Sequence, residues 1–232
     1  MAADHTDGVR HCQSAIGAIS PNNALGVLSP KKSIELNMKL ILASTSPYRL
    51  ALLQRLRIPF ETVDPDVDEA PVEGELPSDR ARRLGALKAA AVTARDALVL
   101  GSDQVACVDG AILHKPRTER AAVQQLISCS GRTVRFWTAV SLRNTATLWQ
   151  GDRVVTCDVR FRDITASEAE RYIELDQPLD CAGSFKWESL GITLFRAIET
   201  DDPTALEGLP LIAVCDLLRE AGLSLPLLSE KM

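Results

Sequence analysis

The sequence has no excess of basic residues, since 26 lysines and arginines stand against 31 aspartates and glutamates and the formal net charge is −5. A general nucleic-acid-binding protein normally presents a basic face, so this balance argues against nucleic acid as a partner. No apolar run approaches the length that crosses a bilayer, and we expect no membrane segment. The hydrophobic fraction of 46% and the charged fraction of 25% are instead typical of a globular protein.

Metal-binding and redox motifs are also missing. The six cysteines include no C-x-x-C pair, and the three histidines have no metal-ligand spacing. This pattern predicts no zinc site, and it predicts reduced thiols in a cytoplasmic protein. The chain has no G-x-x-x-x-G-K-[ST] run, which excludes a P-loop, and no Ser/His/Asp set stands out because His114 is the only histidine beyond the first segment.

The first 37 residues differ from the rest of the chain. They begin with acidic residues, lack the basic start and long apolar run of a signal peptide, and are rich in Gly, Ser, Asn and Pro. We expect residues 1–37 to be a disordered extension, or to follow from a start codon assigned upstream of the true one. One domain is expected over 38–225, with a tail over 226–232, because no linker or internal repeat interrupts that stretch.

What is present begins with a strand over Leu40–Ala43 that leads into a hydroxyl-rich turn and a helix. Ser46 suits the helix cap and Pro47 suits the first helical position. Unpaired N–H groups and the helix dipole at such a turn favour an anion such as phosphate, and Arg49 can bind phosphate oxygens as a planar fork. A well-capped surface helix without a ligand would show the same features, so these residues alone leave both interpretations open.

Strands and helices alternate along the chain, with one hairpin-rich section around Asp109-Gly110. Strands are expected at 60–63, 97–100, 105–108, 111–113, 133–143, 154–161 and 192–198. Helices are expected from Ser78 to Thr93, from Thr118 to Ser128, after a capping box over Thr165–Glu168, and from Pro210 to Gly222. This order predicts an α/β protein with a mixed twisted sheet and flanking helices.

Asp103 is the strongest single candidate for a catalytic or metal-binding residue. It is expected just past the carboxyl end of the strand at 97–100, where open α/β sheets place their ligands. A carboxylate there can bind a divalent cation or take a proton from water, although it could also cap a turn. Glu69 in an acidic loop is a second candidate carboxylate, and Lys88 and Lys115 are candidate cations, each of which could instead be solvated. Together these residues suit metal-assisted hydrolysis of a polyphosphate.

Several short motifs occur in the order seen in the Maf family of nucleoside triphosphate pyrophosphatases, which the chain resembles over about residues 38–225. The motifs are Ser44-Thr-Ser-Pro-Tyr-Arg49, Val67-Asp-Glu69, Arg83-Leu-Gly-Ala-Leu-Lys88-Ala, Gly101-Ser-Asp-Gln104, Lys115-Pro, Ala182-Gly-Ser-Phe-Lys-Trp-Glu188 and Gly208-Leu-Pro-Leu. The resemblance implies a Maf/inosine triphosphatase-like α/β fold with two lobes around a substrate cleft, and usually a homodimer. It also implies cleavage of a nucleoside triphosphate to its monophosphate and pyrophosphate.

The resemblance assigns roles residue by residue. Asp103 would activate water and, with Glu69, bind a divalent metal ion such as Mg, Mn or Co. The phosphates would be bound by Ser44, Arg49, Lys88 and Lys115. A metal and cations would then neutralise the charge that develops on the leaving pyrophosphate.

Three positions sort substrates within the family, and here they are Tyr48, Gln104 and Glu188. The dTTP/UTP branch has Arg at the first position and Gln at the third, whereas this chain resembles the 7-methyl-GTP branch, which usually has Trp at the first. Methylation at N7 makes guanine cationic, and an aromatic face attracts a cation. The alternatives are dTTP or UTP as substrate, or a nucleotide-sensing regulator of cell division without useful catalysis.

Two positions depart from the family pattern. His114 stands where glycine commonly precedes Lys-Pro, and it would strain the turn if that position requires a positive φ. Ser189 replaces a common glycine after Glu188. We expect these departures to affect substrate selectivity more than activity.

Overall fold

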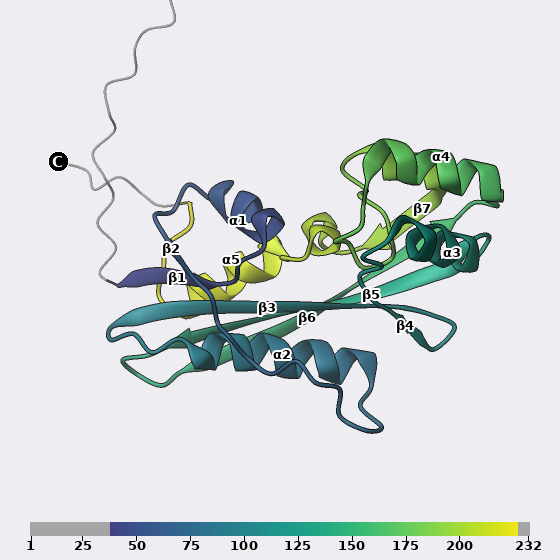
Figure 1. Cartoon of the computed structure of the whole chain (residues 1–232). Helices are drawn as coiled ribbons and strands as arrows, with labels where there is room; N and C mark the ends of the chain where they lie inside the picture. Colours follow the sequence, from purple (N-terminus) through teal and green to yellow (C-terminus); the bar gives the residue numbers. More distant parts are fainter. Residues whose placement is uncertain (1–37, 227–232) are drawn as a thin grey trace, which may run out of the picture. The chain divides into compact units, whose positions relative to one another are not determined.

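A seven-stranded mixed sheet runs through residues 38–226, the part of the chain that the computed structural model describes (Figure 1). Its spatial order is β2-β1-β3-β5-β6-β7, and β4 pairs with β3 off this path. β1 runs parallel to β2 and β3, and the other pairings are antiparallel. The strands are β1 (Lys39–Ala43), β2 (Glu61–Val63), β3 (Ala97–Val108), β4 (Ala111–Leu113), β5 (Thr133–Asn144), β6 (Gln150–Phe161) and β7 (Phe195–Thr200). The predicted mixed sheet is confirmed.

Helices cover the two faces of the sheet unequally (Figure 1). The helices are α1 (Pro47–Gln54), α2 (Pro77–Ala91), α3 (Glu119–Cys129), α4 (Ala166–Asp176) and α5 (Leu211–Glu220), with short 3-10 helices η1 (Leu190–Leu194) and η2 (Pro203–Glu207). α2 lies alone on one face. On the other, α1 and α5 pack over one half of the sheet and α3 and α4 over the other half, in two separate core clusters. The predicted two lobes are therefore present, with η2 between them.

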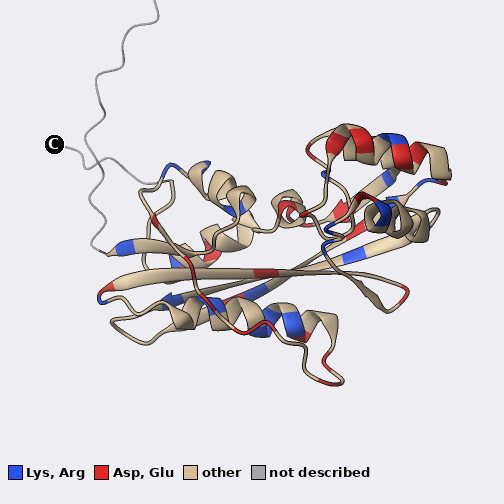
Figure 2. Ribbon diagram, in the orientation of Figure 1, with Lys and Arg blue, Asp and Glu red and all other residues tan. Residues whose placement is uncertain are grey.

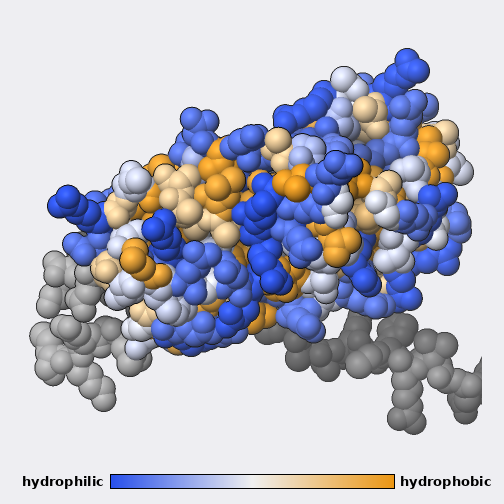
Figure 3. Space-filling view, turned by 90° about the horizontal axis from the view of Figure 1, so that it is seen from below, coloured by the Kyte–Doolittle hydropathy of each residue, from blue (hydrophilic) through white to orange (hydrophobic). Residues whose placement is uncertain are grey.

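Charged residues do not segregate to one face of this fold. Acidic and basic segments are interspersed along the ribbon (Figure 2). Seen from the α2 side, the surface is mostly hydrophilic with separate apolar spots (Figure 3). No helix within residues 38–226 is long and apolar enough to cross a membrane.

Local capping signals set most helix starts. The side chains of Ser46 and Thr118 accept hydrogen bonds from the first turns of α1 and α3, and the capping box of Thr165 and Glu168 is complete. The predicted cap at Ser78 is wrong, because Pro77 occupies the first turn of α2 and Leu76 stands at the cap without a side-chain bond. Proline fits this position because its fixed φ is already helical.

β3 differs most from its predicted form. The strand expected to stop at Leu100 continues without a break to Val108, so Asp103 lies within a strand and not beyond its end. β5 pairs with β3 over Leu98–Val108, whereas β1 pairs with it only as far as Gly101 and β4 only from Ala106. The edge of β3 is therefore open between its two shorter neighbours.

The segment expected as a strand over 192–198 is also partly wrong. Its first half belongs to η1, and β7 starts at Phe195. The N–H of Gly191 donates to the carbonyl of Lys186, and a Cβ at residue 191 would lie 2.4 Å from that oxygen. This tight turn fixes the chain in a helical conformation before the sheet resumes.

Other boundaries shift by a few residues. The strand predicted at 60–63 begins at Glu61, α2 ends at Ala91, and β5 and β6 extend to Asn144 and back to Gln150. The Asp109-Gly110 hairpin is confirmed, with φ of 47° and 84° at the two turn residues. The extension predicted over 1–37 lies outside the described residues, as does the tail predicted over 226–232 except for its first residue.

Candidate active site

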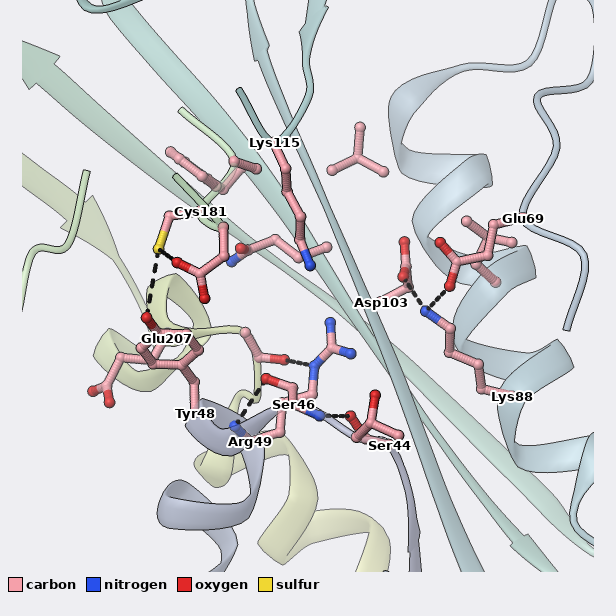
Figure 4. Close-up of a pocket in the computed structure, with 18 of the residues that line it drawn as sticks. Ser44, Ser46, Tyr48, Arg49, Glu69, Lys88, Asp103, Lys115, Cys181 and Glu207 are labelled. Carbon is pink, nitrogen blue, oxygen red and sulfur yellow. Dashed lines mark hydrogen bonds and ion pairs between the residues drawn. The ribbon is translucent and has the colours of Figure 1, made fainter. Parts of the chain in front are cut away.

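A cavity of about 760 Å³ opens at the free edge of β3, between the end of β1 and the start of β4. Side chains of β3 alternate across the sheet, so Asp103 faces α2 while Gln104 faces η2. The cavity reaches both sides, and its volume is typical of small-ligand pockets. It is lined by every predicted site residue, namely Ser44, Tyr48, Arg49, Glu69, Lys88, Asp103, Gln104, Lys115 and Glu188. Figure 4 labels all of these except Gln104 and Glu188.

The turn before α1 uses part of its own hydrogen-bonding capacity. The hydroxyl of Ser44 accepts from the N–H of Ser46 at 3.1 Å, and the hydroxyl of Ser46 accepts from the N–H of Arg49 at 3.4 Å. The predicted set of unpaired N–H groups is thus smaller than expected, because the hydroxyls satisfy two of them. The positive end of the helix still faces the cavity.

Arg49 is held at one side of its guanidinium group. Its Nε donates to the carbonyl oxygen of Gly208 at 2.8 Å, and its two terminal nitrogens point into the cavity (Figure 4). Burial lowers the pKa of Arg49 and the charges of Asp103 and Glu69 raise it, yet arginine stays protonated at neutral pH. This orientation leaves a planar pair of donors facing the cavity, and their binding of a phosphate group stays a prediction.

A lysine joins the two candidate carboxylates. The amino group of Lys88 lies 2.6 Å from Asp103 Oδ1 and 2.7 Å from Glu69 Oε1. Lys88 and Asp103 are each 7% exposed, whereas the Glu69 side chain is half exposed at the cavity rim. Among the described residues only Lys88 donates to the Asp103 side chain, so its second oxygen faces the cavity without a protein donor.

The contact between Lys88 and Asp103 requires α2 to lie very close to β3. A Cβ at Gly101 would lie 2.3 Å from the carbonyl oxygen of Gly85 and 2.5 Å from the amide nitrogen of Ala89. Only glycine permits this approach of two backbones. The glycine of the Gly101-Ser-Asp-Gln104 motif therefore sets the distance across which Lys88 reaches Asp103.

Glu69 is positioned by the arginines of α2. Arg80 donates to the Glu69 carbonyl at 2.7 Å, and Arg83 donates to the next carbonyl, that of Ala70, at 3.2 Å. Burial is the largest single influence on the pKa of Glu69 and raises it. The hydrogen bond and charge of Lys88, with the charges of Arg49 and Lys115, outweigh burial and lower that pKa below its usual value. Glu69 is thus ionised at neutral pH.

The donor set fits a hard divalent cation that is shared with a phosphate. Residues 38–226 contain no group of three or more metal-ligating side chains. Glu69 and Asp103 nevertheless converge on one cation, the amino group of Lys88. Magnesium commonly takes one or two carboxylates and completes its coordination with water and substrate phosphates. These two carboxylates would supply the protein's share of such a site.

The other end of the cavity surrounds Tyr48. The thiol of Cys181 lies 3.7 Å from the Tyr48 hydroxyl and 3.5 Å from the carboxylate of Asp180. Burial raises the pKa of Tyr48, and Cys181 and the charges of Asp180 and Glu188 add to the rise. Tyr48 is thus a neutral aromatic side chain among acidic groups.

Gln104 is engaged with η2. Its amide nitrogen donates to the carbonyls of Ala205 and Leu206 and to the hydroxyl of Thr138, at 2.8, 3.2 and 3.0 Å. The amide oxygen is the part of Gln104 left for a ligand. Its role as a specificity residue stays a prediction, and the structure adds that it holds η2 against the sheet.

The loop that carries Glu188 is anchored on both sides. Phe185 packs edge-on against three other phenylalanines of the α3–α4 core, and Lys186 donates to the carbonyl of Asp176 at 2.9 Å. Ser189 adds a hydrogen bond of 2.7 Å to the Asp176 carboxylate. The second departure from the family pattern therefore has a local partner.

The strain considered at His114 is absent. The residues with a left-handed backbone include Arg117, at φ 64°, but not His114. Histidine is thus accommodated before Lys115-Pro116 without a conformational penalty.

Among the lining residues that sequence reasoning missed are Asp180, Cys181 and Glu207. Asp180 and Cys181 directly precede the Ala182–Glu188 motif, and Glu207 directly precedes Gly208-Leu-Pro-Leu. Proximity to these motifs was the available signal. Charge in a loop gives no indication by itself that a side chain lines a pocket.

Comparison with known proteins finds similar curated proteins that share one name, together with a matching family model. Three of the similar curated proteins are called 7-methyl-GTP pyrophosphatase: those of Aromatoleum aromaticum (53% identical, covering 81% of this chain and 98% of that protein), Xanthomonas oryzae (55%, 81% and 99%) and Pseudomonas aeruginosa (50%, 81% and 98%). A solved structure of a HAM1 protein from Coxiella burnetii is similar with a TM-score of 0.42 and 13% identity, covering 79% of this chain and 99% of that one. A family model described as Maf-like protein matches residues 39–221. The chain belongs to this family of Maf-like proteins.

Proposed function

We propose that this protein hydrolyses 7-methyl-GTP, or a closely similar modified nucleotide, to 7-methyl-GMP and pyrophosphate. The class, a nucleotide pyrophosphatase, follows from the family and from relatives at 50–55% identity that carry that name. The observation that carries the mechanism is the cluster of Lys88, Asp103 and Glu69 at the open edge of β3. A nucleophile activated there would meet a phosphate chain bound at α1.

In this proposal Asp103 would act as the proton acceptor. Lys88 binds one of its oxygens at 2.6 Å, which fixes the orientation of the carboxylate. The second oxygen faces the cavity, where it would accept a hydrogen bond from the attacking water and then its proton. Lys88 would prevent Asp103 from rotating away as the proton moves.

The cations of the site would bind the phosphates and the leaving pyrophosphate. The terminal nitrogens of Arg49 and the amino group of Lys115 both point into the cavity (Figure 4). Hydrogen bonds from fixed donors stabilise the charge that grows on a departing pyrophosphate without reorganisation. A divalent metal held by Glu69 and Asp103 would polarise the phosphoryl group and neutralise part of its charge.

The acidic end of the cavity favours a cationic base. Tyr48 offers an aromatic face, and Glu188 lines the same end without an ion-pair partner among the described residues. N7-methylated guanine carries a positive charge, which an aromatic face and a carboxylate attract. The N–H donors of guanine would in addition find an acceptor in Glu188.

The assignment of Asp103 is tested with D103N, which keeps the size of the side chain but removes its ability to accept a proton. We expect pyrophosphate release from 7-methyl-GTP to fall by about 10²- to 10⁴-fold, with nucleotide binding retained. D109N, at the exposed turn after β3, is the matched control and should behave as wild type.

Two outcomes would contradict the proposal. Wild-type rates in D103N would show that Asp103 is not the proton acceptor. A wild-type protein that binds nucleotide but releases no pyrophosphate would favour the nucleotide-sensing regulator instead.

A further inference from the structure

We propose that Glu207 and Asp180 are further specificity determinants, which together with Glu188 form an acidic rim around Tyr48 that selects a positively charged base. We infer also that Arg55, the partner of Glu207, opposes this selection. The inference rests on the proposed function, since 7-methylguanine is the cationic base concerned. The acidic rim is defined as Asp180, Glu188 and Glu207.

Glu207 is a buried carboxylate, and its only ion-pair partner among the described residues, Arg55, has a half-exposed side chain. Its side chain is 8% exposed, and its two oxygens lie 3.0 and 3.3 Å from one terminal nitrogen of Arg55. The Arg55 side chain, at the end of α1, is 53% exposed. Solvent screens the exposed charge more than the buried one. The cavity side of this pair therefore experiences a net negative potential.

The acidic rim converges on one end of the cavity. Asp180, Glu188 and Glu207 all line it, as does Tyr48. Burial is the main cause of the raised pKa of both Tyr48 and Glu207, and the charge of Glu188 adds to the rise at each. Glu188 thus lies close enough for its charge to influence both Tyr48 and Glu207. Figure 4 shows Glu207, Tyr48 and Cys181 together on one side of the cavity.

Positive charge gathers mainly at the opposite end. The ammonium groups of Lys88 and Lys115 lie toward Asp103 (Figure 4). Besides Arg55, three cations stand near the acidic rim. Arg49 follows Tyr48 and lines the cavity, whereas Lys186 donates to the carbonyl of Asp176 at 2.9 Å and does not line it. The third is Arg117, whose N–H donates to the carbonyl of Leu179 beside Asp180. Arg117 is exposed, so its charge is screened. The acidic rim is therefore the more negative end of the cavity, because at the other end the cations offset the carboxylates of Glu69 and Asp103.

This distribution of charge disfavours the binding of any nucleotide whose base is uncharged. The three carboxylates of the acidic rim repel a bound triphosphate, and a neutral base adds no attraction that compensates for this repulsion. A ring with a positive charge offsets it at short range. The acidic rim therefore favours a cationic base over a neutral one by electrostatics, even where the carboxylates make no contact with the ring.

The test compares two variants that break the same ion pair from opposite sides. E207Q removes the negative charge and R55Q removes the positive one. Binding of 7-methyl-GMP and of GMP is measured by calorimetry on the full-length protein, and the ratio of the two affinities is the readout. We expect the ratio to fall about three- to sevenfold in E207Q and to rise in R55Q, as for one unit charge about 7 Å from the ring at an effective dielectric constant of about 40–80. D180N should lower it as well.

A purely structural role predicts a different pattern. If the pair only holds η2 against α1, both variants lower the ratio or leave it alone, and both unfold at lower urea concentration. E199Q, which breaks the exposed pair between Glu199 and Arg160 on the sheet, is the control for loss of a carboxylate elsewhere. If the affinity ratio changed in the same direction in E207Q and R55Q, the proposed role of the acidic rim would be refuted.

Failure of this inference is separable from failure of the proposed function. A wild type that turns over 7-methyl-GTP faster than GTP, with unmoved affinity ratios in E207Q and R55Q, retains the function and refutes the acidic rim. A wild type without preference in turnover refutes the proposed substrate. In that case opposite shifts of the affinity ratio in the two variants still support the acidic rim, and the absence of shifts refutes it.

Discussion

Replacing Gly101 with alanine should push α2 away from β3 and separate Lys88 from Asp103. The new Cβ would lie 2.3 Å from the Gly85 carbonyl oxygen and 2.5 Å from the Ala89 nitrogen. Even the closest ordinary carbon–oxygen contacts lie at about 3.3 Å. The strand and the helix must therefore part by roughly 1 Å, because both obstacles are backbone atoms that cannot rotate away.

The size of the effect follows from that displacement. Overpacking by one methyl group costs about 1–3 kcal/mol of stability, and we expect the upper end of that range here because no side chain can yield. A shift of roughly 1 Å would also break the 2.6 Å contact between Lys88 and Asp103. Misplacement by that distance lowers catalysis by about 100-fold.

Urea unfolding followed by circular dichroism, together with pyrophosphate release from 7-methyl-GTP, measures both effects. G85A is the matched control on the helix side of the same contact, since its Cβ would meet Ala139 and Asp103 at 3.5 Å or more. Alanine in a helix interior is favoured by about 1 kcal/mol over glycine, so G85A should be at least as stable as wild type. Wild-type stability and activity in G101A, or equal destabilisation in both variants, would refute the reasoning.

Two further predictions concern the site and the fold. K88M leaves Asp103 buried without its partner, and loss of one member of a buried ion pair costs about 3–5 kcal/mol of stability. Because the cavity admits water, we expect urea unfolding to show a loss of about 2–3 kcal/mol. An unchanged free energy of unfolding would contradict the account. T165A removes the cap of α4 and should lower stability by about 1 kcal/mol. The backbone and side-chain hydrogen bonds of Thr165 are the main causes that hold the pKa of Glu168 at about 2. T165A removes the hydroxyl and keeps the backbone N–H, so an NMR titration of T165A should show a partial rise of that pKa, whereas an unmoved pKa would assign the shift to the backbone N–H and Arg162. Because the folded-state pKa is depressed, Glu168 stabilises the fold above its ordinary pKa, and this contribution is lost as pH falls toward 2.

Features encoded by neighbouring residues were accessible from the sequence. The caps at Ser46, Thr118 and Thr165 and the Asp109-Gly110 turn depend on residues a few positions apart, and the structure confirms them. The predicted site residues do line one cavity, because motifs separated in the chain are joined by the sheet. Residues that pattern and chemistry singled out therefore line the same cavity as Tyr48, Gln104 and Glu188, which the family resemblance added, and the roles of all of them stay predictions.

Features that depend on long-range pairing were not accessible. The polar run after Leu100 suggested the end of a strand, but Ser102 donates to the Gly208 carbonyl and Gln104 to η2, so the polar side chains are satisfied by a segment about 100 residues away. The close contact between Gly101 and Gly85 likewise needs both elements in place. The metal, the homodimer and the cytoplasmic location stay predictions.

The most direct measurement is pyrophosphate release from 7-methyl-GTP, GTP, dTTP and UTP at equal concentration with a divalent metal present. The account predicts the highest kcat/KM for 7-methyl-GTP, with 7-methyl-GMP as the second product, because Tyr48, Glu188 and the rest of the acidic rim favour a cationic base. A preference for dTTP or UTP would contradict it and assign the protein to the pyrimidine-specific branch.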